Sequence, residues 1–114
     1  MTDRELLELA AKAAGVKIDT HYVDGGASVW AGEPHNSDWT PDWNPLTDDG
    51  DALRLAVKLH LCADLFDDEI RVQYLSNGNE HDQVSECVSD WEDAYAATRR
   101  AIVRAAAEIG RKMK

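Results

Sequence analysis

Residues 47–62 read TDDGDALRLAVKLHLC and indicate a helix that begins after Thr47 or Asp48. At about 100° per residue, apolar side chains cover most of the circumference of this helix. The narrow polar strip that remains contains Asp51, Arg54 and Lys58. A helix that is apolar over most of its surface is buried on more than one side. We therefore expect it to lie between a sheet and another helix, near the middle of the domain.

A second helix is predicted over residues 2–14. Thr2 is followed three positions later by Glu5, a capping-box spacing in which each side chain accepts a hydrogen bond from the other residue's backbone N–H. The apolar residues at helical spacing behind this start are Leu6, Leu9, Ala10 and Ala13. Gly15 is placed to end the helix, so the sequence predicts a short amphipathic helix.

A third helix, rich in alanine, is predicted from about Glu92 to Arg111, with Ser89 or Asp90 as its cap. Its inner face repeats at helical spacing and contains Tyr95, Thr98, Ile102, Ala105 and Ile109. Its alanines permit close packing against a neighbouring element.

Alternating patterns predict two β-hairpins. The first spans residues 16–31, with a tight turn at residues 24–26. The second pairs residues 69–75 with a weaker strand at about 82–88, across a turn at residues 76–79. The predicted fold class is α+β, with an antiparallel sheet of about four strands, formed by the two hairpins and packed with three helices.

The chain is strongly acidic. It contains 12 Lys+Arg and 22 Asp+Glu, a formal net charge of -10, and its length predicts a single domain over residues 1–114. A negative protein lacks the basic footprint that tight binding to duplex DNA or an anionic membrane needs. The charge is also polarised, because residues 92–114 carry six bases and three acids, or +3, and residues 1–91 carry six bases and 19 acids, or -13. We expect no direct contact with nucleic acid or membrane.

The chain has no apolar stretch long enough to span a membrane and no signal-peptide pattern at its start. Its two cysteines, Cys62 and Cys87, are too few for a disulfide framework and too far apart for a CxxC site. We therefore expect free, buried thiols, no cofactor, and a protein that stays in the cytoplasm.

The acidic residues fall into runs with two interpretations. Two runs precede predicted helices: Asp48, Asp49 and Asp51 in one, and Asp90, Glu92 and Asp93 in the other. A third run contains Asp64, Asp67, Asp68 and Glu69. Carboxylates at a helix start cap free N–H groups, and each gains roughly 0.3–1 kcal/mol from the helix dipole. The functional alternative is a negative surface for a basic protein partner or a metal ion.

Known motifs give little support for catalysis or for a bound metal. An EF-hand loop centred on Gly50 would place Pro45 at the first ligand position, where it cannot coordinate. His60 and Cys62 would point about 160° apart on a helix, so His60 is expected in the core and not at a zinc ion. One enzyme alternative stays open, in which acids beside a histidine hold Mg²⁺ for phosphodiester hydrolysis. Its residues would be Asp48, Asp49, Asp51 and His35.

The segment at residues 32–46 holds every proline and two of the four tryptophans. Long segments without secondary structure are often functional. Trp39 and Trp43 either fold back over the core or form an aromatic contact site, since tryptophan is enriched at interface hot spots.

Three stretches of the chain carry a family resemblance. They are WNPLTDDGDALRLAVKL at residues 43–59, DRELLELAAKAAG at residues 3–15 and ATRRAIVRAAAEIG at residues 97–110. Together they resemble a group of small phage and prophage proteins with the "phage ABA sandwich" domain. The resemblance implies a layered α/β/α sandwich and an accessory role inside a bacterial host, and it provides no catalytic residues.

We therefore expect a non-enzymatic phage accessory protein that binds a host or phage protein through an acidic surface. Small acidic phage proteins include inhibitors of host defence, such as anti-CRISPR proteins that occlude nucleic-acid channels, so a partner with a basic nucleic-acid-binding surface is favoured. The predicted surface comprises Asp38, Trp39, Asp42, Trp43, Asp48, Asp49 and Asp51. The alternatives are a small metal-dependent nuclease or nucleotide hydrolase, and a self-associating structural phage protein. The expected location is the cytoplasm of the bacterial host, as a monomer or homodimer.

Overall fold

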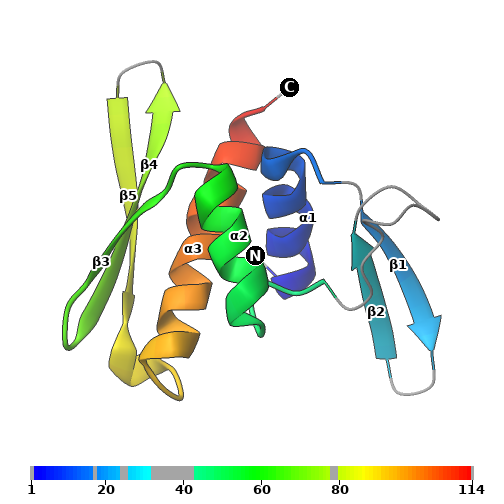
Figure 1. The fold of residues 1–114 in the computed structure, drawn as a ribbon, viewed down its shortest axis with the longest axis horizontal. Coiled ribbons are helices and arrows are strands. Elements are labelled where there is room, and N and C mark those ends of the chain that lie inside the picture. Colours follow the sequence, from blue (N-terminus) through cyan, green and yellow to red (C-terminus); the bar gives the residue numbers. More distant parts are fainter. Residues whose placement is uncertain (1, 17, 24–25, 32–42, 78–79, 114) are drawn as a thin grey trace.

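The computed structural model describes the backbone of residues 2–16, 18–23, 26–31, 43–77 and 80–113, and the side chains of residues 2–16, 43–75 and 81–113. The helices are α1 (Asp3–Ala14), α2 (Asp49–Lys58) and α3 (Ala94–Lys112), and a 3-10 turn, η1 (Val88–Asp90), precedes α3. The strands are β1 (Ile18–Val23), β2 (Gly26–Ala31), β3 (Cys62–Leu65), β4 (Glu69–Asn77) and β5 (Glu80–Cys87) (Figure 1).

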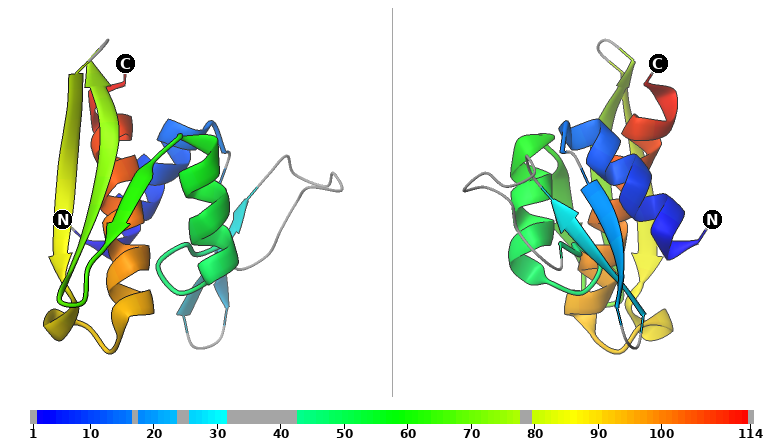
Figure 2. Two further views of the ribbon diagram at one scale, coloured as in Figure 1. Left: turned by 60° about the vertical axis from the view of Figure 1, so that its left-hand side comes forward. Right: turned by 90° about the vertical axis from the view of Figure 1, so that its right-hand side faces the viewer.

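The described strands form two separate antiparallel sheets. One is the β1–β2 hairpin, and the other has three strands in the order β3-β4-β5. All three helices lie on one face of the three-stranded sheet (Figures 1 and 2). The α+β class and both hairpin pairings are confirmed. A single sheet of about four strands is not confirmed, and the described helices do not enclose the sheet from both sides as an α/β/α sandwich would.

Helix α1 begins and ends as the sequence predicts. The Thr2 hydroxyl accepts a hydrogen bond from the Glu5 amide at 3.1 Å, and the Glu5 carboxylate accepts one from the Thr2 amide at 3.4 Å. Gly15 follows in the left-handed conformation, with φ 70°, and its N–H bonds carbonyls of the last turn. The buried face includes Leu6 and Ala10 and also Leu7, Ala11 and Ala14, while Leu9 and Ala13 are half-buried.

The central helix of the domain is α3, and the prediction that α2 occupies this place is wrong. Helix α3 packs against β4 and β5 on one side and against α1 and α2 on the other (Figure 1). Its alanines allow this double contact, because they bring the backbones of neighbouring elements close together. Helix α2 packs mainly on α3, and its Leu53 and Val57 side chains are exposed. Apolar composition therefore did not identify the central helix.

Helices α1 and α3 approach each other very closely at Gly110. A β-carbon placed on Gly110 would run into the carbonyl oxygen of Leu9 and would lie 2.8 Å from its carbonyl carbon. Only a glycine lets the two helices touch backbone to backbone at this point.

Helix α3 starts later than predicted. Asp93 is its N-cap and accepts a hydrogen bond from the Ala96 amide at 2.8 Å. The predicted caps, Ser89 and Asp90, belong to η1 instead. Tyr95, expected on the inner face, is exposed, while Ile102 further along the same face is buried.

Helix α2 stops at Lys58, and β3 begins at Cys62, a strand that the sequence did not predict. Between them His60 adopts the left-handed conformation, with φ 55°. His60 is exposed, so its predicted place in the core is wrong. Cys62 and Cys87 are free thiols, as expected, but both are exposed and not buried.

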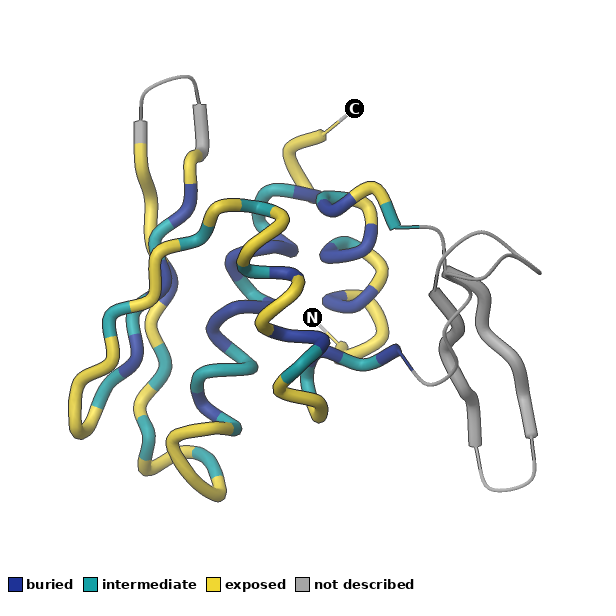
Figure 3. Tube along the Cα trace, viewed as in Figure 1, coloured by how far each residue is buried: buried dark blue, intermediate teal, exposed yellow. Residues whose placement is uncertain are grey.

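The main core surrounds α3 and includes buried residues of the sheet, α1 and α2, and a smaller cluster lies beside α1 (Figure 3). Ile70, Val72 and Val103 are completely enclosed in the main core. The smaller cluster contains Leu7, Ala11 and Trp43. In the part of the chain that the structure describes, no helix is both long and apolar enough to cross a membrane.

Candidate interaction surface

Of the seven residues predicted to bind a partner, Asp38, Trp39 and Asp42 lie outside the described residues. Trp43 is only 8% exposed, and its side chain packs against Leu7 and Ala11 of α1. This tryptophan therefore anchors the chain that leads into α2 to the outer side of α1.

Asp51 is a buried carboxylate, 7% exposed, in the first turn of α2. One of its oxygens accepts a hydrogen bond from the Asn44 amide at 3.0 Å, and the other accepts one from the Arg54 guanidinium at 2.6 Å. A buried charge is tolerated when it is paired and hydrogen-bonded in this way. Asp51 therefore fixes residues 43–46 to α2 and is not free to meet a partner.

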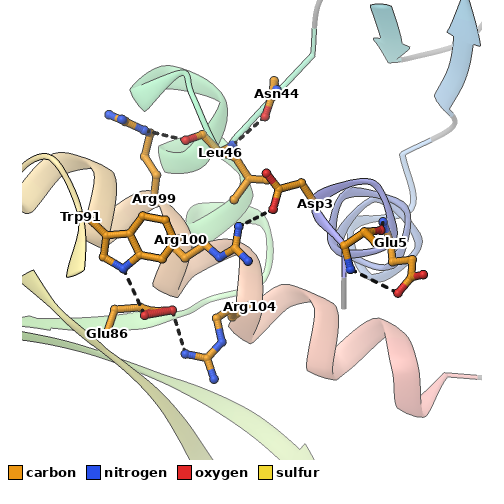
Figure 4. Close-up of polar contacts among 10 residues, drawn as sticks. Asp3, Glu5, Asn44, Leu46, Glu86, Trp91, Arg99, Arg100 and Arg104 are labelled. Carbon is orange, nitrogen blue, oxygen red and sulfur yellow. Dashed lines mark hydrogen bonds and ion pairs between the residues drawn. The ribbon is translucent and has the colours of Figure 1, made fainter. Parts of the chain in front are cut away.

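Asp48 and Asp49 are exposed and also have structural roles. Asp48 is the N-cap of α2 and accepts a hydrogen bond from the Asp51 amide at 2.8 Å. Asp49 forms an ion pair with Arg99 of α3 at 2.6 Å. The Arg99 guanidinium also donates a hydrogen bond to the Leu46 carbonyl at 2.9 Å, which Figure 4 shows. The interpretation of this run as helix-capping acids is confirmed for Asp48.

Every arginine of the chain is paired with a carboxylate of the same chain. Within or next to one element the pairs are Arg4–Glu8, Arg54–Asp51, Arg71–Glu69 and Arg111–Glu108. Between distant elements they are Arg99–Asp49, Arg100–Asp3 and Arg104–Glu86. The arginine of each long-range pair belongs to α3. The positive charges of Arg99, Arg100 and Arg104 are therefore neutralised by acids of the elements that pack against this helix.

Trp91 connects two of these pairs (Figure 4). Its indole N–H donates to Glu86 at 3.2 Å, and Glu86 also accepts from Arg104 at 2.9 Å. The Arg100 guanidinium lies over the indole ring, 5.2 Å from the ring centroid, and bonds Asp3 of α1. The network ties α1, β5 and α3 together.

Ion pairs shift the pKa of Glu69, Arg71 and Arg111. The hydrogen bond from Arg71 lowers the pKa of Glu69, and the same contact raises the pKa of Arg71. The hydrogen bond to Glu108 raises the pKa of Arg111. Burial raises the pKa of Tyr74, which lies in the main core. All four groups keep their ordinary charge near neutral pH.

A different set of acids forms no close ion pair in the part of the chain that the structure describes, although Asp68 interacts electrostatically with Arg71 at longer range. We call it the acidic end, and it consists of Asp67, Asp68, Asp90, Glu92 and Asp93, all exposed. The first two lie in the turn between β3 and β4, and the others precede or cap α3. The Val88 amide donates to the Asp68 carbonyl at 3.0 Å, which joins the two segments. Figure 1 shows the turn and the starts of α2 and α3 at one end of the molecule.

The sequence identified these acids as runs but did not assign them to the site. Alternation and charge counting cannot show that the β3–β4 turn lies beside the start of α3, because that contact depends on the sheet. Among the described residues no group of three or more His, Cys, Asp and Glu side chains could hold a metal ion. His35, part of the proposed Mg²⁺ cluster, lies outside them.

No protein-family profile matches the chain, and neither the curated proteins nor the solved structures contain a significant match to it.

Proposed function

We propose that this protein is a non-enzymatic binding protein whose acidic end attracts a basic surface of a partner protein. The observation that carries the proposal is the pairing of all seven arginines within the chain. Because these guanidinium groups already face carboxylates, they contribute little positive potential to the surface. The carboxylates of the acidic end are then the charges that an approaching molecule meets first.

The acidic end has the features of an electrostatic docking surface. Its five carboxylates are exposed, and four of them, all except that of the α3 cap Asp93, form no hydrogen bond or close ion pair in the described part of the chain. Unpaired charges on one end of a small protein steer an oppositely charged partner and raise the association rate. A protein surface that normally holds nucleic acid has the required positive charge, and this supports a partner of that kind.

The biological setting is part of the proposal. The resemblance to phage proteins supports an accessory role in the cytoplasm of a bacterial host, with inhibition of a host defence protein as its specific form. Asp38, Trp39 and Asp42 stay in the proposed surface together with Asp48 and Asp49.

The proposal is tested with two variants that change the net charge equally. Asp67→Asn with Glu92→Gln neutralises the acidic end, and Glu8→Gln with Asp82→Asn neutralises two exposed acids elsewhere. Affinity capture from host lysate should recover a partner with the wild type and the control pair, and about tenfold less with the acidic-end pair. Equal recovery with both pairs would show that the acidic end is not the binding surface.

A third variant, Asp38→Asn with Asp42→Asn, measures the contribution of the segment that precedes Trp43. Raising the salt concentration should weaken capture, because screening shortens the range of the interaction between exposed charges.

A further inference from the structure

Four large apolar side chains on α2, α3 and β3 are exposed to solvent. The exposed fractions are 64% for Leu53 and 67% for Val57 of α2, 67% for Leu65 of β3 and 68% for Tyr95 of α3. Scattered exposed leucines are normal, but a contiguous apolar area on a small protein marks an interaction site. The register of the sheet and the helical repeats show how these residues are related.

The inner face of the sheet is only partly covered at β3. In the antiparallel register Ala63 lies opposite Val72, and Leu65 lies opposite Ile70. Opposite residues point to the same face of a sheet. Val72 and Ile70 are buried in the core against the helices, whereas Ala63 and Leu65 are exposed. The helical layer therefore covers β4 but only part of β3, because α3 approaches β3 and still leaves Ala63 and Leu65 exposed.

The two neighbouring helices leave apolar residues open on the same flank. Leu53 and Val57 are one turn apart on α2, roughly opposite Asp51, which faces Asn44 and the α1 side. Tyr95 belongs to the stripe of α3 that is buried further along at Ile102. The left view of Figure 2 shows α2 and β3 both on the viewer's side of α3. We call Leu53, Val57, Ala63, Leu65 and Tyr95 the apolar face.

The charges around the apolar face are negative at one end. Asp49 precedes Leu53 by one helical turn, Asp67 follows Leu65 by two residues, and Glu92 precedes Tyr95 by three. Among the described bases near this face, Arg99 is paired with Asp49, and Arg54, which is exposed next to Leu53, is paired with Asp51. Lys58 lies at the opposite end of α2. An occupant of the face must therefore bring apolar side chains together with positive charges.

We propose that the apolar face binds an amphipathic helix of the partner protein, with leucine-like residues on one side and lysine or arginine beside them. This inference rests on the proposed function and specifies the partner's binding element. A helix would lie along α2 and over Ala63 and Leu65, and it would complete the helical layer above β3. The small Ala63 side chain allows its close approach. A second copy of the chain fits poorly, because it carries the same net charge of -10.

The probe is a synthetic amphipathic peptide of about five helical turns, with leucines at the i, i+3, i+4 and i+7 positions and lysines elsewhere. Its twin has glutamate in place of lysine. Fluorescence anisotropy measures the affinity of both peptides for the wild type and three variants. Leu53→Ser and Leu65→Ser alter the apolar face at exposed positions, so both should fold. Leu75→Ser is the matched control, because Leu75 is exposed and points away from the buried side chain of its neighbour Tyr74.

The lysine peptide should bind the wild type and Leu75→Ser with equal affinity and bind Leu53→Ser and Leu65→Ser at least about tenfold more weakly. The glutamate twin should not bind. Undiminished binding to the two apolar-face variants would overturn this inference and leave the proposed function standing, since the peptide would then be held by charge alone. The inference would also be overturned if the lysine peptide did not bind the wild type. The proposed function would still stand in that case if the Asp67→Asn, Glu92→Gln variant lost the partner captured from lysate.

Analytical ultracentrifugation of the protein alone tests whether a second copy of the chain occupies the apolar face. The wild type should sediment as a monomer at micromolar concentration. A dimer that Leu65→Ser dissociates would identify a second copy as the occupant and overturn the inference.

Discussion

The contact between α1 and α3 at Gly110 leads us to predict that replacing this glycine by alanine lowers the free energy of unfolding, the opposite of the usual effect in a helix. At an ordinary position inside a helix, replacing glycine by alanine stabilises a protein by about 1 kcal/mol. At Gly110 the new β-carbon would meet the backbone carbonyl of Leu9. This carbonyl is part of α1, so it can move away only if one helix shifts relative to the other. Gly110→Ala should therefore be destabilising.

The magnitude follows from two opposing effects. Overpacking in a core costs about 1–3 kcal/mol, and we take the upper value because the obstacle is backbone and not the end of a flexible side chain. Subtracting about 1 kcal/mol for the helical preference of alanine leaves a net loss of about 2 kcal/mol. For a domain of this size the midpoint of thermal unfolding should fall by about 8 °C.

Thermal and urea unfolding followed by circular dichroism measures this change, with Gly50→Ala as the control. A β-carbon on Gly50 in α2 would lie 3.2 Å from a carboxylate oxygen of Asp48 and 3.3 Å from a guanidinium nitrogen of Arg54, both at side-chain ends that can yield. Gly50→Ala should leave the free energy of unfolding unchanged or raise it by up to about 1 kcal/mol. A Gly110→Ala protein as stable as the wild type would refute the backbone contact between α1 and α3.

Three other predictions concern the acids and the buried tryptophan. Trp43→Ala should lower the free energy of unfolding by about 3–4 kcal/mol, because it empties the cluster beside α1; a change below about 0.5 kcal/mol in urea unfolding would instead place this side chain on the surface. Asp93→Ala should lower the free energy of unfolding by about 1 kcal/mol, because it removes the cap of α3. Asp90→Ala should change the free energy of unfolding by less than about 0.5 kcal/mol, and equal losses in the two variants would contradict the assignment of Asp93 as the cap. Because Arg71 lowers the pKa of Glu69, this pair stabilises the fold above the ordinary pKa of glutamate, about 4.3, and the contribution is lost as the pH falls through the lowered value. Glu69→Gln should therefore show a shallower loss of stability between neutral and acid pH, and an unchanged slope would exclude the contribution.

Local signals in the sequence were sufficient for both ends of α1 and for the hairpins. The Thr2 and Glu5 spacing identified the start of α1, and Gly15 identified its end, because both features act through bonds within a few residues. The alternating residues of β4 likewise depend on one periodicity. These elements form for reasons that can be read from neighbouring positions.

The layering could not be predicted in the same way. Both α2 and α3 have apolar or small residues over much of their surface, and periodicity does not show which of them acquires neighbours on two sides. The decisive difference is size, since the alanines of α3 let two layers approach it closely, whereas Leu53 and Val57 remain exposed on α2. Strand β3 was missed because its residues continue the apolar run of α2, and the break is a left-handed histidine, His60, without a glycine or proline beside it.

The four described residues of the predicted site, Trp43, Asp48, Asp49 and Asp51, all have contacts within the fold. The division of the chain into a -13 and a +3 segment did not locate the acidic end, because Glu92 and Asp93 belong to the +3 segment. It also did not show that three arginines of α3 would pair with carboxylates from three other elements. Charge counts along a sequence contain no information about long-range pairing. For that reason the unpaired acids at the β3–β4 turn emerged only from the folded structure.

Strand β3 stands at the edge of its sheet, and this position affects how the protein behaves in concentrated solution. An edge strand offers backbone N–H and C=O groups to any other strand, and an apolar residue such as Leu65 strengthens that tendency. At neutral pH the mutual repulsion of molecules with ten excess negative charges keeps such edges apart. Near the isoelectric point, about 4.6, that repulsion disappears while the edge stays available. The surface carboxylates therefore also protect the protein from edge-to-edge aggregation, and mild acidification removes that protection.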